Sequence, residues 1–253
     1  GLSGANMFSR EEERMNKRLA GAAMLFLAAS TALVWNPARV SAHGDVTPQP
    51  VDTTGLPELG DEWLEENPWR DPSKPEWKIA VEKGASGYNQ NCARCHGLEA
   101  VSGGTAPDLR FLEANPDGDA WFVERFTLGY TQGGITKMPA FGELLGQKAG
   151  WAIRTYIETR PDEGAMDEYQ AELQDAKKKL ADFLAAGKTA PDVEADLASL
   201  KTRLADISGK VKTGSGAPLA DSVASRTEAA LNGSPESLKK AEEILTIGLS
   251  AAK

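Results

Sequence analysis

The sequence is poor in the side chains that bind metals and cross-link chains, because its 253 residues include only two cysteines and two histidines. A structural zinc site takes four such ligands, and His43 lies far upstream of Cys92, Cys95 and His96. A zinc site is therefore disfavoured. A thioredoxin-like redox pair needs a βαβ setting, whereas the surroundings of these cysteines indicate helix and loop. The loop between them is also too short to favour a structural disulfide.

Positive charge is scarce as well. The 28 lysines and arginines are outnumbered by 37 acidic residues, which gives a net charge of −9. Nucleic acids and anionic membrane surfaces attract basic proteins, so we expect neither as a partner. The acidic residues form no paired acid and base site in the sequence, and we therefore expect a protein that is not an enzyme.

The one pronounced apolar run lies near the N-terminus, from Leu19 to Trp35. A basic segment, Met15-Asn16-Lys17-Arg18, precedes it and the small residues Val40-Ser41-Ala42 follow it, a pattern typical of a secretory signal peptide. Residues 1–42 are therefore predicted to be upstream residues plus a signal peptide, cleaved after Ala42 on export to the periplasm. The run is at the short end of what spans a membrane, so an uncleaved membrane anchor stays open.

What the sequence does contain is Cys92-Ala93-Arg94-Cys95-His96, the attachment signature of c-type haem. Each thiol forms a thioether with one haem vinyl group, and the two intervening residues let both sulfur atoms reach one edge of the porphyrin. The next side chain then lies beneath the iron. We predict one covalently attached haem c, with thioethers at Cys92 and Cys95 and with His96 as an axial ligand of the iron.

A second axial ligand is predicted at Met138. Downstream of the signal the only methionines are Met138 and Met166, and Met166 lies in a polar, helical segment. Met138 follows a glycine-rich loop about forty residues after His96. Ligation by histidine and methionine raises the haem potential and leaves no open coordination position. Electron transfer is therefore favoured, and a haem enzyme or gas sensor with a labile Met138 is the alternative.

The periodicity predicts an all-α protein. Residues 43–75 are proline-rich and non-periodic, which indicates an extended arm that Trp63, Leu64 and Trp69 pin to a haem domain at 76–162. Contact of these three side chains with a partner is the alternative. Within the haem domain we expect a helix from about Glu76, a loop over 97–109, a short helix capped by Asp119 and ending at Leu128, a glycine-rich connection over 129–136 and a last helix over 145–159.

Residues 76–160 resemble a class I cytochrome c. The resemblance implies that the first and last helices cross where Gly84 allows close approach, with Tyr88 and Tyr156 at the crossing. It also implies that the Pro107 carbonyl accepts a hydrogen bond from the proximal histidine, which fixes the imidazole through its other nitrogen. Leu109 is then a neighbour that packs against the haem.

The sequences around the motif resemble, more closely, the PedF-type cytochromes c that accompany PQQ-dependent alcohol dehydrogenases. The matching segments are 43–48, 88–100, 106–110 and 151–154. This resemblance implies a periplasmic carrier that takes single electrons from such a dehydrogenase. It implies delivery of these electrons to a terminal oxidase or another cytochrome.

The remaining residues, 163–253, are rich in Ala, Lys, Glu and Leu and contain no further haem ligand. Apolar residues recur every three or four positions, and glycines divide the segment into three or four helices with starts expected at Thr189 and Ser234. We expect a C-terminal helical bundle or hairpin, with an extended dimerising coiled coil as the alternative. Such an extension also allows a fixed haem subunit of a stable respiratory or dehydrogenase complex, docked through these helices.

Overall fold

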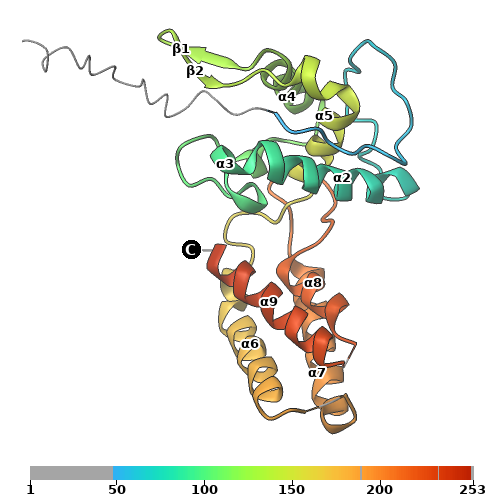
Figure 1. Cartoon of the computed structure of the whole chain (residues 1–253), viewed down its shortest axis with the longest axis vertical. Coiled ribbons are helices and arrows are strands. Elements are labelled where there is room, and N and C mark those ends of the chain that lie inside the picture. The colour runs from blue at the N-terminus through green and yellow to red at the C-terminus, as the bar shows by residue number, and fades with distance from the viewer. Residues whose placement is uncertain (1–47, 189, 233, 252–253) are drawn as a thin grey trace, which may run out of the picture. The chain divides into compact units, whose positions relative to one another are not determined.

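The computed structural model describes residues 48–188, 190–232 and 234–251, which belong to one structural unit of the chain (Figure 1). The predicted signal peptide with its cleavage after Ala42, His43 and the helix start at Thr189 lie outside these residues. The described part is mainly helical, which confirms the all-α prediction. Its elements in chain order are α2 (Pro75–Asn91), α3 (Ala93–His96), η2 (Leu98–Ala100), η3 (Leu109–Phe111), α4 (Pro116–Leu128), β1 (Tyr130–Gln132), β2 (Ile135–Met138), α5 (Gly142–Glu158), η4 (Asp167–Tyr169), α6 (Gln170–Ala185), α7 (Ala190–Lys210), α8 (Val223–Ala230) and α9 (Pro235–Ala251).

The crossing of α2 and α5 is the centre of the N-terminal half (Figure 1). Gly84 lies at the contact, where an added Cβ would stand 1.9 Å from the Ala152 carbonyl oxygen and 2.9 Å from the Tyr156 Cβ. Only glycine fits a contact this close. One turn along α2, the rings of Tyr88 and Tyr156 pack with their centroids 5.2 Å apart. The crossing that the resemblance implied is therefore confirmed.

The arm preceding α2 is held by two tryptophans. Trp69 is buried, and the ring of Trp63 lies 5.7 Å from that of Phe126 and 6.1 Å from that of Trp151, centroid to centroid. Leu64, in contrast, is 38% exposed. The apolar residues of the arm therefore contact this chain's own core as expected, except for Leu64.

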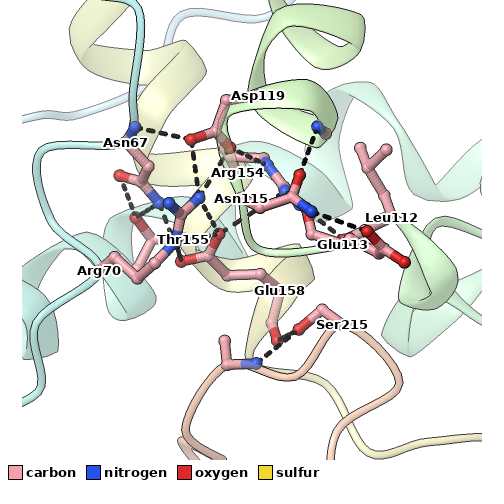
Figure 2. Close-up of polar contacts among 12 residues, drawn as sticks. Asn67, Arg70, Leu112, Glu113, Asn115, Asp119, Arg154, Thr155, Glu158 and Ser215 are labelled. Carbon is pink, nitrogen blue, oxygen red and sulfur yellow. Dashed lines mark hydrogen bonds and ion pairs between the residues drawn. The ribbon is translucent and has the colours of Figure 1, made fainter.

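A buried charge network joins the arm to α4 and α5 (Figure 2). The side chains of Asp119, Arg154 and Glu158 are fully buried, and Arg70 of the arm donates to Asp119 at 2.7 Å and to Glu158 at 3.0 Å. Arg154 donates to Asp119 at 2.9 Å. Two cations thus neutralise two anions. Removing one partner would leave an unpaired buried charge, which costs about 3–5 kcal/mol.

The predicted cap at Asp119 is wrong. The helix begins earlier, at Pro116, and its N-cap is Asn115, whose side-chain oxygen accepts from the Gly118 N–H at 2.8 Å. Asp119 lies inside the helix and faces Arg70 and Arg154. Asparagine and aspartate are about equally good N-caps, so the local sequence does not decide between Asn115 and Asp119. Asp119 instead pairs with Arg70 and Arg154, which lie far from it in the sequence.

The glycine-rich connection after α4 forms a two-stranded antiparallel hairpin, β1 with β2, that the sequence did not predict. Gly133 and Gly134 form its turn, with φ of 57° and 76°, the left-handed values that a tight hairpin turn requires. The last helix also begins earlier than expected, at Gly142, and bends at Gly146 where φ is 73°. The hairpin brings the chain back so that β2 ends at Met138.

The four C-terminal helices pack as a bundle, in which α9 contacts α6 and α8 while α8 contacts α7 (Figure 1). Their buried apolar side chains form a core of their own, which includes Leu173, Leu180, Leu204, Leu238 and Leu245. The start of α9 is as predicted, since the Ser237 N–H donates to the Ser234 side chain at 3.2 Å. The bundle, and not the extended coiled coil, is the arrangement observed.

Among the helices that the structure describes, none combines the length and the apolar character that a membrane span requires.

Candidate functional site

The two cysteines and the histidine lie on one helical turn. Helix α2 ends at Asn91, and α3 continues the chain from Ala93 to His96. The His96 N–H donates to the Cys92 carbonyl at 2.9 Å and the Cys95 N–H donates to the same oxygen at 3.1 Å. Residues three and four apart on a helix share one face, so Cys92, Cys95 and His96 are presented together.

Both thiols are free and partly buried, so neither is used in a disulfide. Burial raises the pKa of the Cys92 thiol to about 12, with a smaller contribution from Cys95. Before it reacts, Cys92 is therefore an uncharged thiol at neutral pH. The charged thiolate is disfavoured because the buried Cys92 sulfur would be poorly solvated. An uncharged thiol is compatible with an apolar reaction partner such as a haem vinyl group.

His96 is buried, and its Nδ1 lies 2.9 Å from the Pro107 carbonyl oxygen. A carbonyl can only accept, so Nδ1 carries the proton and Nε2 keeps its lone pair. Burial lowers the pKa of the imidazole, and the bond to Pro107 acts in the opposite direction. The neutral imidazole is the metal-binding form, and a hydrogen bond on the second nitrogen fixes its tautomer and orientation.

The loop from Gly97 to Leu109 carries Pro107 back over His96. Gly97 has φ of 78°, and an added Cβ would lie 1.9 Å from the Val101 carbonyl oxygen, so the turn requires glycine. The Tyr88 hydroxyl donates to the Gly97 carbonyl at 2.8 Å. At the other end of the loop Leu109 is buried in the apolar core of this half.

Met138 ends strand β2 and is partly buried. It packs against the same apolar cluster as Cys92 and Leu109, together with Phe141 from the start of α5. The structure thus places a thioether sulfur, a thiol and the predicted packing leucine in one cluster. The residues present fit a covalently attached haem, since free thiols, an imidazole oriented through Nδ1 and a methionine are the donors that this group takes.

Sequence reasoning missed a group of charged residues beside this site. Arg160 at the end of α5 contacts Glu99 of the loop and Asp221 of the C-terminal extension, and Arg226 contacts the same two carboxylates. Nothing in the local sequence links residues more than sixty positions apart. Tyr88 was placed correctly at the helix crossing, but its bond to the loop was not foreseen.

Comparison with known proteins identifies the N-terminal half. Residues 79–157 match the family described as cytochrome C oxidase, cbb3-type, subunit III. Cytochrome c550 of Pseudomonas aeruginosa is 57% identical over 118 residues, which cover 47% of this chain and 81% of that protein. Quinohemoprotein alcohol dehydrogenase ADH-IIG of Pseudomonas putida is 39% identical over 62 residues, or 19% of this chain and 9% of that enzyme. No solved structure shows significant similarity.

These relatives bear directly on the cofactor and on the kind of protein. The likeness to cytochrome c550 covers 81% of that protein, and the family match over residues 79–157 includes the Cys92-to-His96 motif of this chain. The chain carries covalently bound haem c and is a mono-haem, electron-transfer protein. It belongs to the class I cytochromes c.

Proposed function

We propose that the chain is an exported carrier that accepts single electrons from a PQQ-dependent alcohol dehydrogenase and passes them to a terminal oxidase or another cytochrome. In this proposal the signal within residues 1–42 is removed after Ala42. The observation that carries the proposed site is the 2.9 Å contact between His96 Nδ1 and the Pro107 carbonyl, on a helical turn that also presents two free thiols.

Each site residue has one task. Cys92 and Cys95 would hold the haem through thioethers, and His96, oriented by the Pro107 carbonyl, would bind the iron through Nε2. Met138 would be the second iron ligand, and Leu109 would pack against the haem within the same apolar cluster. The haem supplies a one-electron couple, and ligation by histidine and methionine leaves no position for a substrate.

The proposed donor is supported by three observations. The segments around the motif resemble cytochromes that accompany such dehydrogenases, and 62 residues of this chain are 39% identical to part of a quinohemoprotein alcohol dehydrogenase. After removal of residues 1–42 the carrier has 34 acidic and 23 basic residues, a net charge of −11. Such a carrier also favours a donor with a basic docking surface, because opposite charges raise the rate of encounter. Redox encounters use small, transient interfaces.

The haem assignment is tested by replacing Cys92 and Cys95 together with serine. The double variant should lose haem that resists acidified-acetone extraction, while His96→Ala should keep covalent haem with an altered spectrum. The donor is tested by stopped-flow reduction of the ferric protein with a purified PQQ-dependent alcohol dehydrogenase and its alcohol. Reduction no faster than in the absence of alcohol would refute the proposed donor.

The alternative is a fixed haem subunit docked to a complex through residues 163–253. The observed contacts favour the carrier. Within the described residues, the segment between α7 and α8 forms hydrogen bonds with the part of this chain before residue 163, which we call the haem half. Affinity purification separates the two, since a fixed subunit co-purifies with its complex at high salt and a carrier does not. Truncation at residue 163 is a poor test, because it also removes Asp221, one of the two carboxylate partners of the buried Arg160.

A further inference from the structure

The segment that links α7 to α8 lies against the haem half of the chain. We call residues 212–222 the strap. Its contacts with that half are hydrogen bonds from Asp162 N to Lys212 O at 2.8 Å, from Ala114 N to Ser215 O at 3.0 Å, from Ala220 N to Thr159 O at 3.4 Å and from the Ser215 hydroxyl to Glu158 O. Figure 2 shows Ser215 at the end of α5.

The approach is close enough to require glycine at one point. A Cβ on Gly214 would lie 2.9 Å from the Arg110 carbonyl oxygen, just after the loop that carries Pro107. The strap therefore packs on backbone of the haem half through specific polar contacts. The strap is therefore part of the structure around the loop from Gly97 to Leu109, which we call the haem loop. It anchors the bundle there between α7 and α8.

Beyond the strap's backbone contacts, a cluster of four charges reaches the haem loop itself. Arg160 donates to Glu99 at 3.0 Å and to both oxygens of Asp221 at 3.0 Å. Arg226, on α8, donates to Glu99 at 3.2 Å and to Asp221 at 2.7 Å. We call these residues the charge cluster. Arg160 is 1% exposed and the other three side chains are about two-thirds buried, so solvent screens these pairs less than surface pairs.

Glu99 stands in a backbone conformation that needs support. Glu99 and Ala100 have φ of 57° and 62°, the left-handed region that side chains other than glycine rarely adopt. Such conformations persist only where the surroundings hold them. The three-residue turn at this point, closed by the Val101 N–H to the Leu98 carbonyl at 3.0 Å, begins two residues after His96.

A second connection runs from the charge cluster to the same turn. The guanidinium of Arg160 lies 4.3 Å from the centroid of the Tyr156 ring, which packs against the ring of Tyr88. The hydroxyl of Tyr88 donates to the Gly97 carbonyl. The backbone on both sides of Leu98 is thus tied to the cluster, directly at Glu99 and through two rings at Gly97.

We propose that Asp221 and Arg226 are positioning residues for the haem loop. They hold Glu99 in its left-handed conformation, and this keeps the Pro107 carbonyl on the proton of His96 Nδ1. The C-terminal extension is therefore a clamp on the proximal side of the haem. The inference depends on the proposed assignment of His96 as a haem ligand and adds a role for residues outside the haem half.

The test is the variant Arg226→Gln in the haem-loaded, full-length protein. The matched control is Arg203→Gln, which removes the same charge from an arginine that also pairs with two carboxylates, Glu172 and Asp206, on the surface of the bundle. Proton NMR of the ferrous protein follows exchange of His96 Nδ1–H and of the Val101 amide. We expect both to exchange about tenfold faster in Arg226→Gln, the ratio that corresponds to about 1.4 kcal/mol.

Arg203→Gln should leave both rates unchanged, and Arg226→Lys should restore most of the protection. A second variant, Glu99→Gln, removes the loop's carboxylate while Arg160 keeps Asp221, and it should give the same local effect. Unchanged rates in Arg226→Gln and Glu99→Gln would overturn the proposal. Equal acceleration in the Arg203→Gln control, or throughout the bundle, would overturn it too. Covalent haem is retained in all four variants, whereas its retention in the cysteine double variant contradicts the proposed haem site instead.

Discussion

Replacing Gly84 with alanine should destabilise the protein although alanine favours helix. The gain in helix propensity is about 0.5–1 kcal/mol, but the new Cβ would stand 1.9 Å from the Ala152 carbonyl oxygen. That oxygen belongs to the backbone of α5, so the contact is relieved only if the two helices move apart. Overpacking of this kind costs about 1–3 kcal/mol, occasionally more, and we expect a net loss of about 2 kcal/mol.

The matched control is Gly209→Ala, a glycine inside helix α7 with no atom within 4 Å of an added Cβ. It should leave stability unchanged or raise it slightly. Guanidinium unfolding followed by far-ultraviolet circular dichroism measures both, and the Gly84 variant should lower the midpoint by about 0.5 M at an m value of about 4 kcal/mol/M. Equal midpoints for the two variants would refute the close helix crossing.

Three further changes test the network and the charge cluster. Asp119→Asn leaves the buried cations Arg70 and Arg154 with one anion, Glu158, in place of two. It should cost about 3–5 kcal/mol, measured by the same unfolding experiment. Asn115→Ala removes the cap of α4 and an exposed hydrogen bond to Glu113, and it should cost about 1 kcal/mol; a larger loss than for Asp119→Asn would contradict the division of roles. Burial raises the pKa of Asp221, but its bonds to Arg160 and Arg226 outweigh this and lower the pKa below 3.8. The stability from Asp221 is therefore complete above about pH 4 and lost as the pH falls further, so Asp221→Asn should flatten the acid limb of a stability profile.

Much of the haem half followed from local patterns. The apolar spacing predicts α2 and the main part of α5, whereas their crossing at Gly84 was implied by the resemblance to class I cytochromes c. Cys92, Cys95 and His96 are adjacent in sequence, so their common helical face could be predicted from spacing alone. Trp63 and Trp69 were expected to hold the arm, and both pack on this chain's core.

The features that were not predicted depend on residues distant in sequence. The sequence predicts a cap at Asp119, because nothing in the local sequence shows that Arg70 and Arg154 surround this side chain. The hairpin strands, three and four residues long, are too short for an alternating pattern to be recognised. The strap has no periodic spacing of apolar residues. The sequence therefore predicts helices separated by glycines in the C-terminal extension, and it does not predict the contacts of the strap with the haem half.

The central claim is that His96 and Met138 both bind the haem iron, and one absorption measurement tests it most directly. Ferric class I cytochromes with this ligand pair have a weak methionine-to-iron charge-transfer band in the far red. The band should be present at neutral pH, absent in Met138→Ala, and unchanged in Met166→Ala, whose methionine packs on the separate core of the helical bundle. A ferric protein without the band, or a band that survives in Met138→Ala, would contradict the account.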